Sequence, residues 1–95
     1  MKSFLLLNRN MLPRISKVKV LGDLLLCVSF EDGSCVSYDL REDINEIPAF
    51  KALEETIGLF RSFTVDASRT CISWTDQIDL PSDTIREYGT PMEWE

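Results

Sequence analysis

Apolar and polar residues alternate along residues 15–40, a pattern typical of β-strands that bury one face and expose the other. In the first of these segments Val18 and Val20 fall on one face, whereas Lys17 and Lys19 fall on the other. Turn-forming residues interrupt the alternation twice. The pattern therefore predicts three antiparallel strands, over residues 15–21, 24–30 and 34–40.

The turn between the second and third strands decides which residues face each other. A two-residue loop would place the apolar side chains of one strand beside the polar side chains of the next. A three-residue loop, residues 31–33, puts every large apolar residue on one face, with Gly33 in the left-handed position of a type I turn. We predict this second register, in which the facing pairs are Val28 with Val36 and Leu26 with Tyr38.

A helix is expected in the middle of the chain. Pro48 suits the first turn of a helix, and apolar residues follow it at helical spacing. We predict that this helix runs to about Ile57, with Gly58 as its C-cap and a buried face made of Ala49, Phe50, Leu53 and Ile57. The preceding residues 40–47 are expected to form one helical turn or a loop.

Two more strands are expected after the helix. A strand over residues 62–66 directs Phe63 and Val65 inward, and a strand over residues 70–74 ends at Trp74, which covers the core. Residues 77–80 either extend this fifth strand or pair separately.

A second helix, from Pro81 to about Tyr88, completes the expected fold. Asp79 is expected to cap it or to lock the preceding turn. The predicted class is α+β, a mostly antiparallel sheet of about five strands with two short helices packed against it. The chain divides into an N-terminal arm, a single domain and a loose acidic tail, over residues 1–10, 11–89 and 90–95.

Several short segments follow one another in a distinctive order. Pro13-Arg14-Ile15 leads into a Lys-Val-Lys-Val strand, followed by "LLLCVSFEDGSCVSYDL", "FKAL", "GLFRSFTVD" and "ISWTDQIDLPSDTIREYG". From about residue 11 to residue 89, this order resembles the small bacterial family known as domain of unknown function 2442. The resemblance implies a compact α+β domain with an antiparallel sheet, no established activity and no catalytic residues to transfer.

The same resemblance implies two kinds of partner. Proteins of this kind often lie beside small genes of toxin type, which implies an antitoxin role. Others are joined to a helix-turn-helix domain, for which this chain has no room, so that DNA binding does not carry over. The chain departs from the family after Trp74, where Thr75-Asp76-Gln77 replaces a Pro-Asn-Gly-like turn, although Asp79 matches the aspartate that follows.

Composition and charge narrow the function further. Ninety-five residues suit one domain, and the net charge of −6 repels phosphate backbones, so direct nucleic-acid binding is disfavoured and a basic protein partner is favoured. The chain lacks histidine, the commonest general base, and we predict that it is not an enzyme. The apolar segment at residues 4–7 is shorter than a secretory core of about 7–15 residues or a membrane span of about 20. The expected location is the cytoplasm, without a membrane partner.

The three cysteines, Cys27, Cys35 and Cys71, are expected to be reduced thiols with a structural role. Their odd number argues against a disulfide scaffold, and they lack the spacing of a zinc site. In the predicted register Cys27 and Cys35 are diagonal neighbours on the face opposite the apolar one. Their Cα atoms would lie roughly 7–8 Å apart, beyond the usual disulfide range of about 4.4–6.8 Å.

Carboxylates gather near the C-terminus at Asp76, Asp79, Asp83 and Glu87. Oxygen ligands of this kind could hold Mg²⁺ or Ca²⁺ and support a metal-dependent enzyme. The favoured interpretation is structural, because negative charge in the first turn of a helix complements the helix dipole. We therefore predict no metal, no cofactor and no catalytic residue.

Apolar residues near the two ends are the candidate partner contacts. Four large apolar residues at positions 4–7 are costly to leave in water, and Trp94 lies outside any expected element beside Met92. Tryptophan is a frequent interface anchor, although a tail residue without a role is the alternative. The proposed contacts are Phe4, Leu5, Leu7, Met92 and Trp94, and exposed sheet edges make a homodimer plausible.

The sequence thus favours a non-catalytic protein-interaction module, and the resemblance implies an antitoxin-like partner of a small basic toxin encoded nearby. Two alternatives stay open, an accessory domain of a transcriptional regulator and a metal-dependent enzyme that uses Asp76, Asp79 and Asp83.

Overall fold

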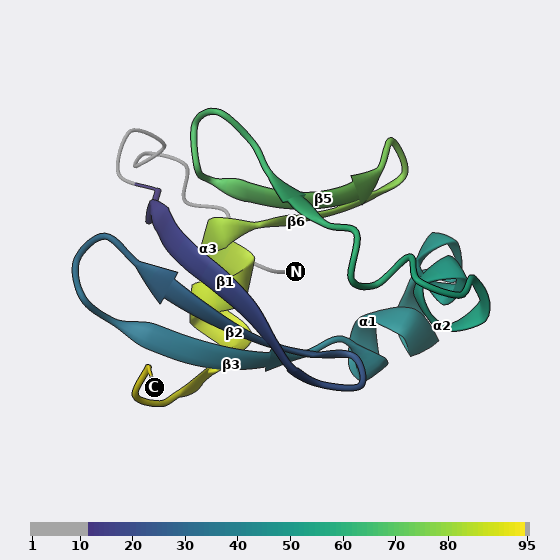
Figure 1. The fold of residues 1–95 in the computed structure, drawn as a ribbon, viewed down its shortest axis with the longest axis horizontal. Coiled ribbons are helices and arrows are strands. Elements are labelled where there is room, and N and C mark those ends of the chain that lie inside the picture. Colours follow the sequence, from purple (N-terminus) through teal and green to yellow (C-terminus); the bar gives the residue numbers. More distant parts are fainter. Residues whose placement is uncertain (1–11, 95) are drawn as a thin grey trace.

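Seven short strands form two antiparallel sheets in residues 12–94, the part of the chain that the computed structural model describes (Figure 1). Three α-helices and one 3₁₀ helix connect or cover these strands. The fold is therefore α+β with antiparallel pairing, as predicted. The strands number seven instead of about five and the α-helices three instead of two, and the later strands form a sheet of their own.

The first sheet has the order β1-β2-β3-β7, and its first three strands form a meander. Val28 faces Val36 and Leu26 faces Tyr38, which confirms the predicted register. Its strands are β1 (Ile15–Gly22), β2 (Leu25–Phe30), β3 (Cys35–Asp39) and β7 (Thr90–Pro91).

Gly33 closes the turn between β2 and β3 in the predicted left-handed conformation. Its φ is +94°, and its N–H donates to the carbonyl of Phe30 at 3.0 Å. The neighbouring carboxylate of Asp32 accepts hydrogen bonds from the backbone N–H and the hydroxyl of Ser34, at 2.9 and 2.6 Å. A side chain at position 33 would be strained, because residues with a Cβ seldom adopt this φ.

The second sheet has the order β4-β5-β6. Ile72 faces Leu80, so the segment over residues 77–80 pairs with the fifth strand instead of extending it. β4 contains only two residues, fewer than the five expected, and pairs Thr64 with Ser73. Its strands are β4 (Thr64–Val65), β5 (Cys71–Thr75) and β6 (Ile78–Pro81).

The helix predicted from Pro48 to Ile57 is interrupted and shorter than expected. The 3₁₀ helix η2 (Pro48–Lys51) leads into a single turn, α2 (Ala52–Glu55). Thr56 then takes an extended conformation, with φ −101° and ψ 114°, so the chain leaves the helix before Ile57. Two β-branched residues directly before a glycine favour this early end. The preceding segment forms the short helix α1 (Arg41–Glu46).

The last helix, α3 (Ser82–Tyr88), packs against β3 and β6 (Figure 1). It begins one residue later than predicted, because Pro81 still pairs with Cys71 in the second sheet. Pro81 is also the N-cap residue, without a side-chain hydrogen bond at the cap, so Asp79 does not cap this helix.

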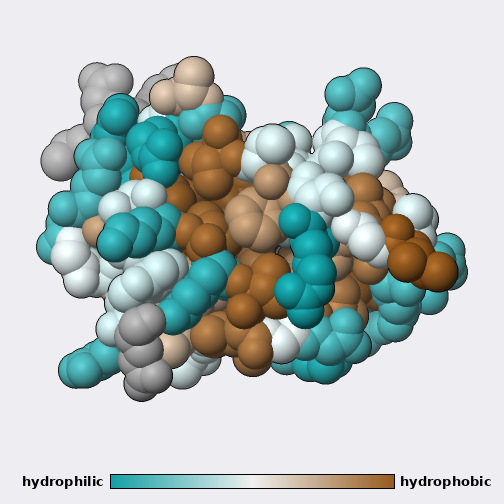
Figure 2. Space-filling model, viewed as in Figure 1, coloured by the Kyte–Doolittle hydropathy of each residue, from teal (hydrophilic) through white to brown (hydrophobic). Residues whose placement is uncertain are grey.

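One apolar core is shared by both sheets. It corrects the expectation that a single sheet lines the interior. Figure 2 shows apolar side chains reaching the surface in the middle of the face drawn in Figure 1, with hydrophilic residues around them. The large apolar residues with 0% exposure come from both sheets, α3 and the β3–α1 junction: Ile15, Leu26, Val28, Leu40, Ile72 and Ile85.

Arg69 joins the two sheets at one end. Its guanidinium donates to the carbonyl oxygens of Ile15 and Ser16, and its own carbonyl accepts from the N–H of Ile15 at 2.7 Å. Arg69 has a φ of +64°, and Asp66 braces this conformation by accepting from the N–H of Thr70 at 3.0 Å. Ser68 and the other groups bonded to Asp66 lower the pKa of its carboxyl.

Gly89 lets the end of α3 approach β3. A Cβ at this position would lie 2.6 Å from the carbonyl oxygen of Ile85 and 2.7 Å from Cγ2 of Val36. The chain then runs into β7, where Thr90 faces Ser37. The expected loose tail over residues 90–95 is therefore wrong for Thr90 and Pro91, which belong to the first sheet.

Candidate protein-interaction surface

The helices α1, η2 and α2 form a projection at one end of the molecule, which we name the helical arm and define as residues 41–57 (Figure 1). The arm carries five carboxylates and two basic side chains, so its net charge is −3, half of the charge of the whole chain. This concentration of negative charge favours a positively charged partner.

Buried apolar residues hold the helical arm to the first sheet. Ile44, Phe50 and Leu53 belong to the main core. The hydroxyl of Tyr38 in β3 also donates to Oδ2 of Asp43 in α1 at 2.7 Å, and both side chains are buried. Burial, together with this hydrogen bond, raises the pKa of the Tyr38 hydroxyl.

Asp39 fixes the start of the arm. Its Oδ1 accepts from the backbone N–H of Arg41 at 3.0 Å, and its Oδ2 pairs with the Arg41 guanidinium at 3.1 Å. The carboxylate thus holds the first residue of α1, whereas the N-cap residue is Leu40 and makes no side-chain hydrogen bond at the cap.

Ile57 ends the helical arm with its side chain entirely in solvent, whereas helical spacing predicts it to be buried. Its relative exposure is 101%, and Ile47 in the same arm is 40% exposed. The prediction is wrong because the chain leaves α2 after Glu55, so that Ile57 no longer continues the face of Leu53. The signal that could have revealed this was the adjacent Gly58, which has a φ of +81°.

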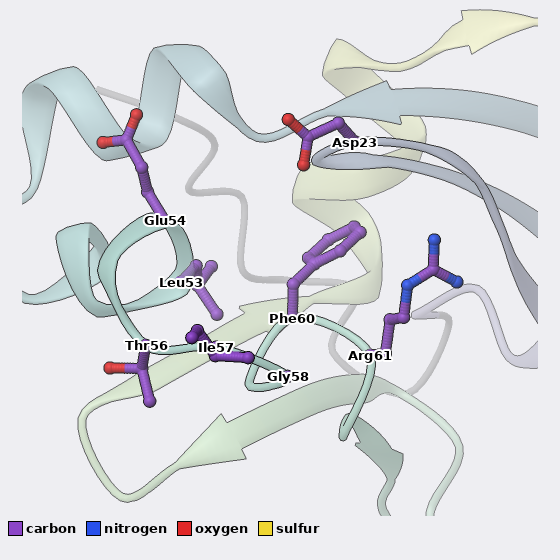
Figure 3. A pocket seen from close by; sticks show the side chains of 8 residues that line it. All are labelled: Asp23, Leu53, Glu54, Thr56, Ile57, Gly58, Phe60 and Arg61. Carbon is purple, nitrogen blue, oxygen red and sulfur yellow. The ribbon is translucent and has the colours of Figure 1, made fainter.

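A cavity of about 190 Å³ lies beside Ile57 (Figure 3). Leu53, Ile57 and Phe60 supply apolar lining, while Asp23 and Arg61 bring opposite charges from the β1–β2 turn and the segment before β4. An apolar side chain with a nearby charged group would match this lining. The geometry therefore suits contact with a protein side chain.

A second cavity, of about 370 Å³, lies where the start of the arm meets the end of α3. Its lining includes Asp39, Glu42, Tyr38 and Tyr88. The carboxylates and phenols give this cavity an acidic and aromatic character, so it adds to the negative surface at the base of the arm.

The predicted terminal contacts have separate outcomes. Phe4, Leu5 and Leu7 lie outside the described residues. Met92 donates its N–H to the carbonyl of Cys35 at 3.0 Å. Trp94 lies against β1, with Nζ of Lys17 and of Lys19 at 5.7 and 4.5 Å from its ring centroid. The partner role of these five residues stays a prediction.

The carboxylates near the C-terminus are distributed over three elements. Asp76 lies in the β5–β6 turn, Asp79 on β6, and Asp83 and Glu87 on α3. Within residues 12–94, histidine, cysteine, aspartate and glutamate side chains form no group of three or more placed to hold a metal ion. Oδ1 of Asp83 instead accepts from the N–H of Thr84 at 2.9 Å in the first turn of α3.

The β2–β3 turn carries a strongly stabilised carboxylate. Hydrogen bonds from Ser34 and an ion pair with Arg86 of α3 lower the pKa of Asp32. The Arg86 guanidinium also lies 5.1 Å from the ring centroid of Phe30. These contacts tie the turn to α3, and we assign them a structural role.

Cys27, Cys35 and Cys71 all carry thiols in the structure. Cys71 lies on the second sheet, and burial raises the pKa of its thiol. Cys27 and Cys35 lie on the first sheet with the predicted diagonal relation, yet their Sγ atoms meet at 3.2 Å.

Comparison with protein-family models, curated proteins and solved structures finds no match to the chain. The resemblance to domain of unknown function 2442 therefore stays a prediction. Within residues 12–94, no helix combines the length and apolar character needed to cross a membrane.

Proposed function

We propose that the chain is a non-catalytic protein-interaction module that binds a small basic protein through its helical arm, in the manner of an antitoxin that binds a toxin encoded nearby. The observation that carries this proposal is the fully exposed Ile57, which lies beside a cavity with apolar and charged lining on an arm whose net charge is −3. A large apolar side chain in water has an unfavourable free energy, which a partner that covers it removes.

The negative charge of the helical arm and the exposed side chain of Ile57 would have different roles in the complex. The net charge of −3 on the helical arm would attract a basic partner and raise the association rate. Ile57 and the cavity formed with Leu53 and Phe60 would supply the desolvated contact that slows dissociation. Such a module needs no catalytic residue and would act in the cytoplasm.

The experiment begins with co-expression of the full chain and the product of each neighbouring gene, followed by affinity purification. We expect one small basic protein to co-purify in a fixed ratio. Isothermal titration calorimetry of the purified pair then gives the affinity of the wild type and of Ile57→Ser. Loss of a central anchor should weaken binding by roughly 30-fold, because hot-spot residues contribute about 2 kcal/mol or more.

Leu21→Ser is the matched control, since Leu21 is 41% exposed on β1, outside the helical arm. It should bind as the wild type does. Raising the salt concentration should slow association of the wild type, because it screens the acidic arm. A chain that purifies without any neighbouring product, or equal weakening by both serine variants, would overturn the proposal.

A further inference from the structure

The outer face of the first sheet holds a pair of cysteines in contact. Sγ of Cys27 and Sγ of Cys35 lie 3.2 Å apart, and the two residues are 0% and 7% exposed. Cys27 faces Ser37 and Cys35 faces Ser29, so the cysteines are diagonal neighbours on adjacent strands. The side chains lean toward each other across this diagonal, which brings the sulfur atoms together without a bond.

A positive charge lies on the same face. Lys19 of β1 is directly opposite Cys27 in the sheet, and facing residues of an antiparallel pair share one face. Its Nζ lies 4.5 Å from the ring centroid of Trp94, so this charge lies beside the C-terminal segment.

The C-terminal segment crosses this face. Met92 is hydrogen-bonded to Cys35 in β3, whereas the Trp94 ring lies against Lys17 and Lys19 in β1. Since β2 lies between β3 and β1, the segment from Met92 to Trp94 extends from β3 toward the lysine side chains of β1, on the side of the sheet that carries Cys27. Figure 1 shows this end of the chain turning back beside β3.

We propose that Cys27 and Cys35 are an oxidation site for hydrogen peroxide, which converts them into an intramolecular disulfide, and that the C-terminal segment controls access to it. The Cys35 thiolate attacks one peroxide oxygen, and the O–O bond breaks to give a sulfenic acid and hydroxide, which takes up a proton to become water. The Cys27 thiol then attacks the sulfenic sulfur. The S–S bond forms and a second water leaves.

The balance of this reaction is complete. Two thiols lose two electrons in total, one peroxide molecule gains them, and two water molecules result. Cys35 reacts first because it keeps some exposure, whereas Cys27 is fully covered. The sulfur atoms must approach by about 1.2 Å to reach the usual bond length of about 2.05 Å. Side-chain rotation and a small local change in strand separation supply this movement.

Cys71 provides an internal comparison. It lies on the second sheet, and its Sγ contacts the carbonyl of Ile72 at 3.6 Å instead of another thiol. It therefore lacks a second cysteine in contact that could resolve a sulfenic acid. Oxidation of the full chain should consume two thiols as a pair and leave Cys71 reduced.

The experiment treats the reduced full-length chain with hydrogen peroxide, alkylates the remaining thiols and measures intact and peptide masses. We expect a loss of two hydrogens and a peptide pair linked through Cys27 and Cys35, reversible by dithiothreitol. Cys71→Ala should give the same product at the same rate. Cys27→Ala should stop at the sulfenic acid of Cys35, which a dimedone probe captures.

Trp94→Ala tests the control of access. Loss of its contacts with two lysines should raise the rate of disulfide formation about tenfold, through more frequent opening of the C-terminal segment. A disulfide that includes Cys71, or peroxide treatment of the wild type that yields no Cys27–Cys35 linkage, would overturn the proposed site. An unchanged rate in Trp94→Ala would overturn the role of the segment. The wild-type linkage decides the site even if a cysteine variant fails to fold.

Discussion

The β2–β3 hairpin buries almost every apolar side chain that it carries, whereas the helical arm leaves one entirely in solvent. Leu26 and Val28 of the hairpin have no exposed area, while Ile57 of the arm is fully exposed. The hairpin is held by a continuous ladder between two strands, but α1 and α2 each span less than two turns. Short helices are marginal without tertiary contacts. Burial is therefore most complete in the meander, whereas the arm leaves a large apolar side chain uncovered.

The sharpest test of this contrast removes one apolar side chain from each region. Leu26→Ala should lower the free energy of unfolding by about 3 kcal/mol, because it leaves a cavity in the core. Ile57→Ala should change it by less than about 0.5 kcal/mol, because the side chain already lies in water. Urea denaturation followed by circular dichroism measures both. Similar losses in the two variants would contradict the difference in burial.

The second largest effect on the free energy of unfolding is expected from the hydrogen bond that links the hairpin to the helical arm. Tyr38→Phe should destabilise the protein by about 2 kcal/mol, because it removes the donor to the buried Asp43 carboxylate. The double variant Tyr38→Phe with Asp43→Leu should recover part of this loss, since neither buried polar group then remains. Chemical denaturation of the wild type, the two single variants and the double variant gives the coupling energy. Additive losses would show that the two side chains do not depend on each other.

The turn of the hairpin should respond less strongly. Gly33→Ala should lower the free energy of unfolding by about 1 kcal/mol, because alanine is strained at a φ of +94°. Gly22→Ala is the control, since its Cβ would meet no atom within 4 Å and its φ is not left-handed. Thermal unfolding should separate the two variants. Equal midpoints would mean that the strain at position 33 is relieved locally.

The smallest expected effect is a dependence of the protein's stability on pH below 4. Hydrogen bonds from Ser34 and the ion pair with Arg86 hold the pKa of Asp32 below its usual value of 3.8. A lowered pKa in the folded state stabilises the protein above pH 3.8, and that contribution is lost as the pH falls through the folded value. The unfolding midpoint of the wild type should therefore fall more steeply below pH 4 than that of Asp32→Asn. Parallel curves would remove Asp32 as a source of acid sensitivity.

The alternation of apolar and polar residues was sufficient to predict the strands and the register of the meander. It was not sufficient to predict the rest of the fold. The alternation of residues 15–40 and a single glycine define the register of β2 and β3, because a slip by one residue would expose the apolar face. The division into two sheets could not be predicted, since it depends on contacts such as Arg69 with Ile15 that join distant segments.

The local sequence pattern was also insufficient to predict the candidate protein-interaction surface. Ile57 fits a helical face by spacing, but the end of α2 is decided by the backbone at Thr56 and Gly58. Trp94 stands out in the sequence by its position outside any expected element, whereas its contact with Lys17 and Lys19 depends on how the C-terminal segment folds back toward β1. The closeness of Cys27 and Cys35 depends on side-chain rotamers, which periodicity does not specify.

The bond between Arg69 and the first strand also has a consequence for the order of folding. Its two residues are 54 positions apart in the sequence, and closing a flexible loop of that length costs about 3.5 kcal/mol in chain entropy. The hairpins close over far fewer residues, so each can form before the sheets dock. Arg69→Ala should accordingly speed unfolding and leave the early burst of strand formation unchanged in stopped-flow measurements.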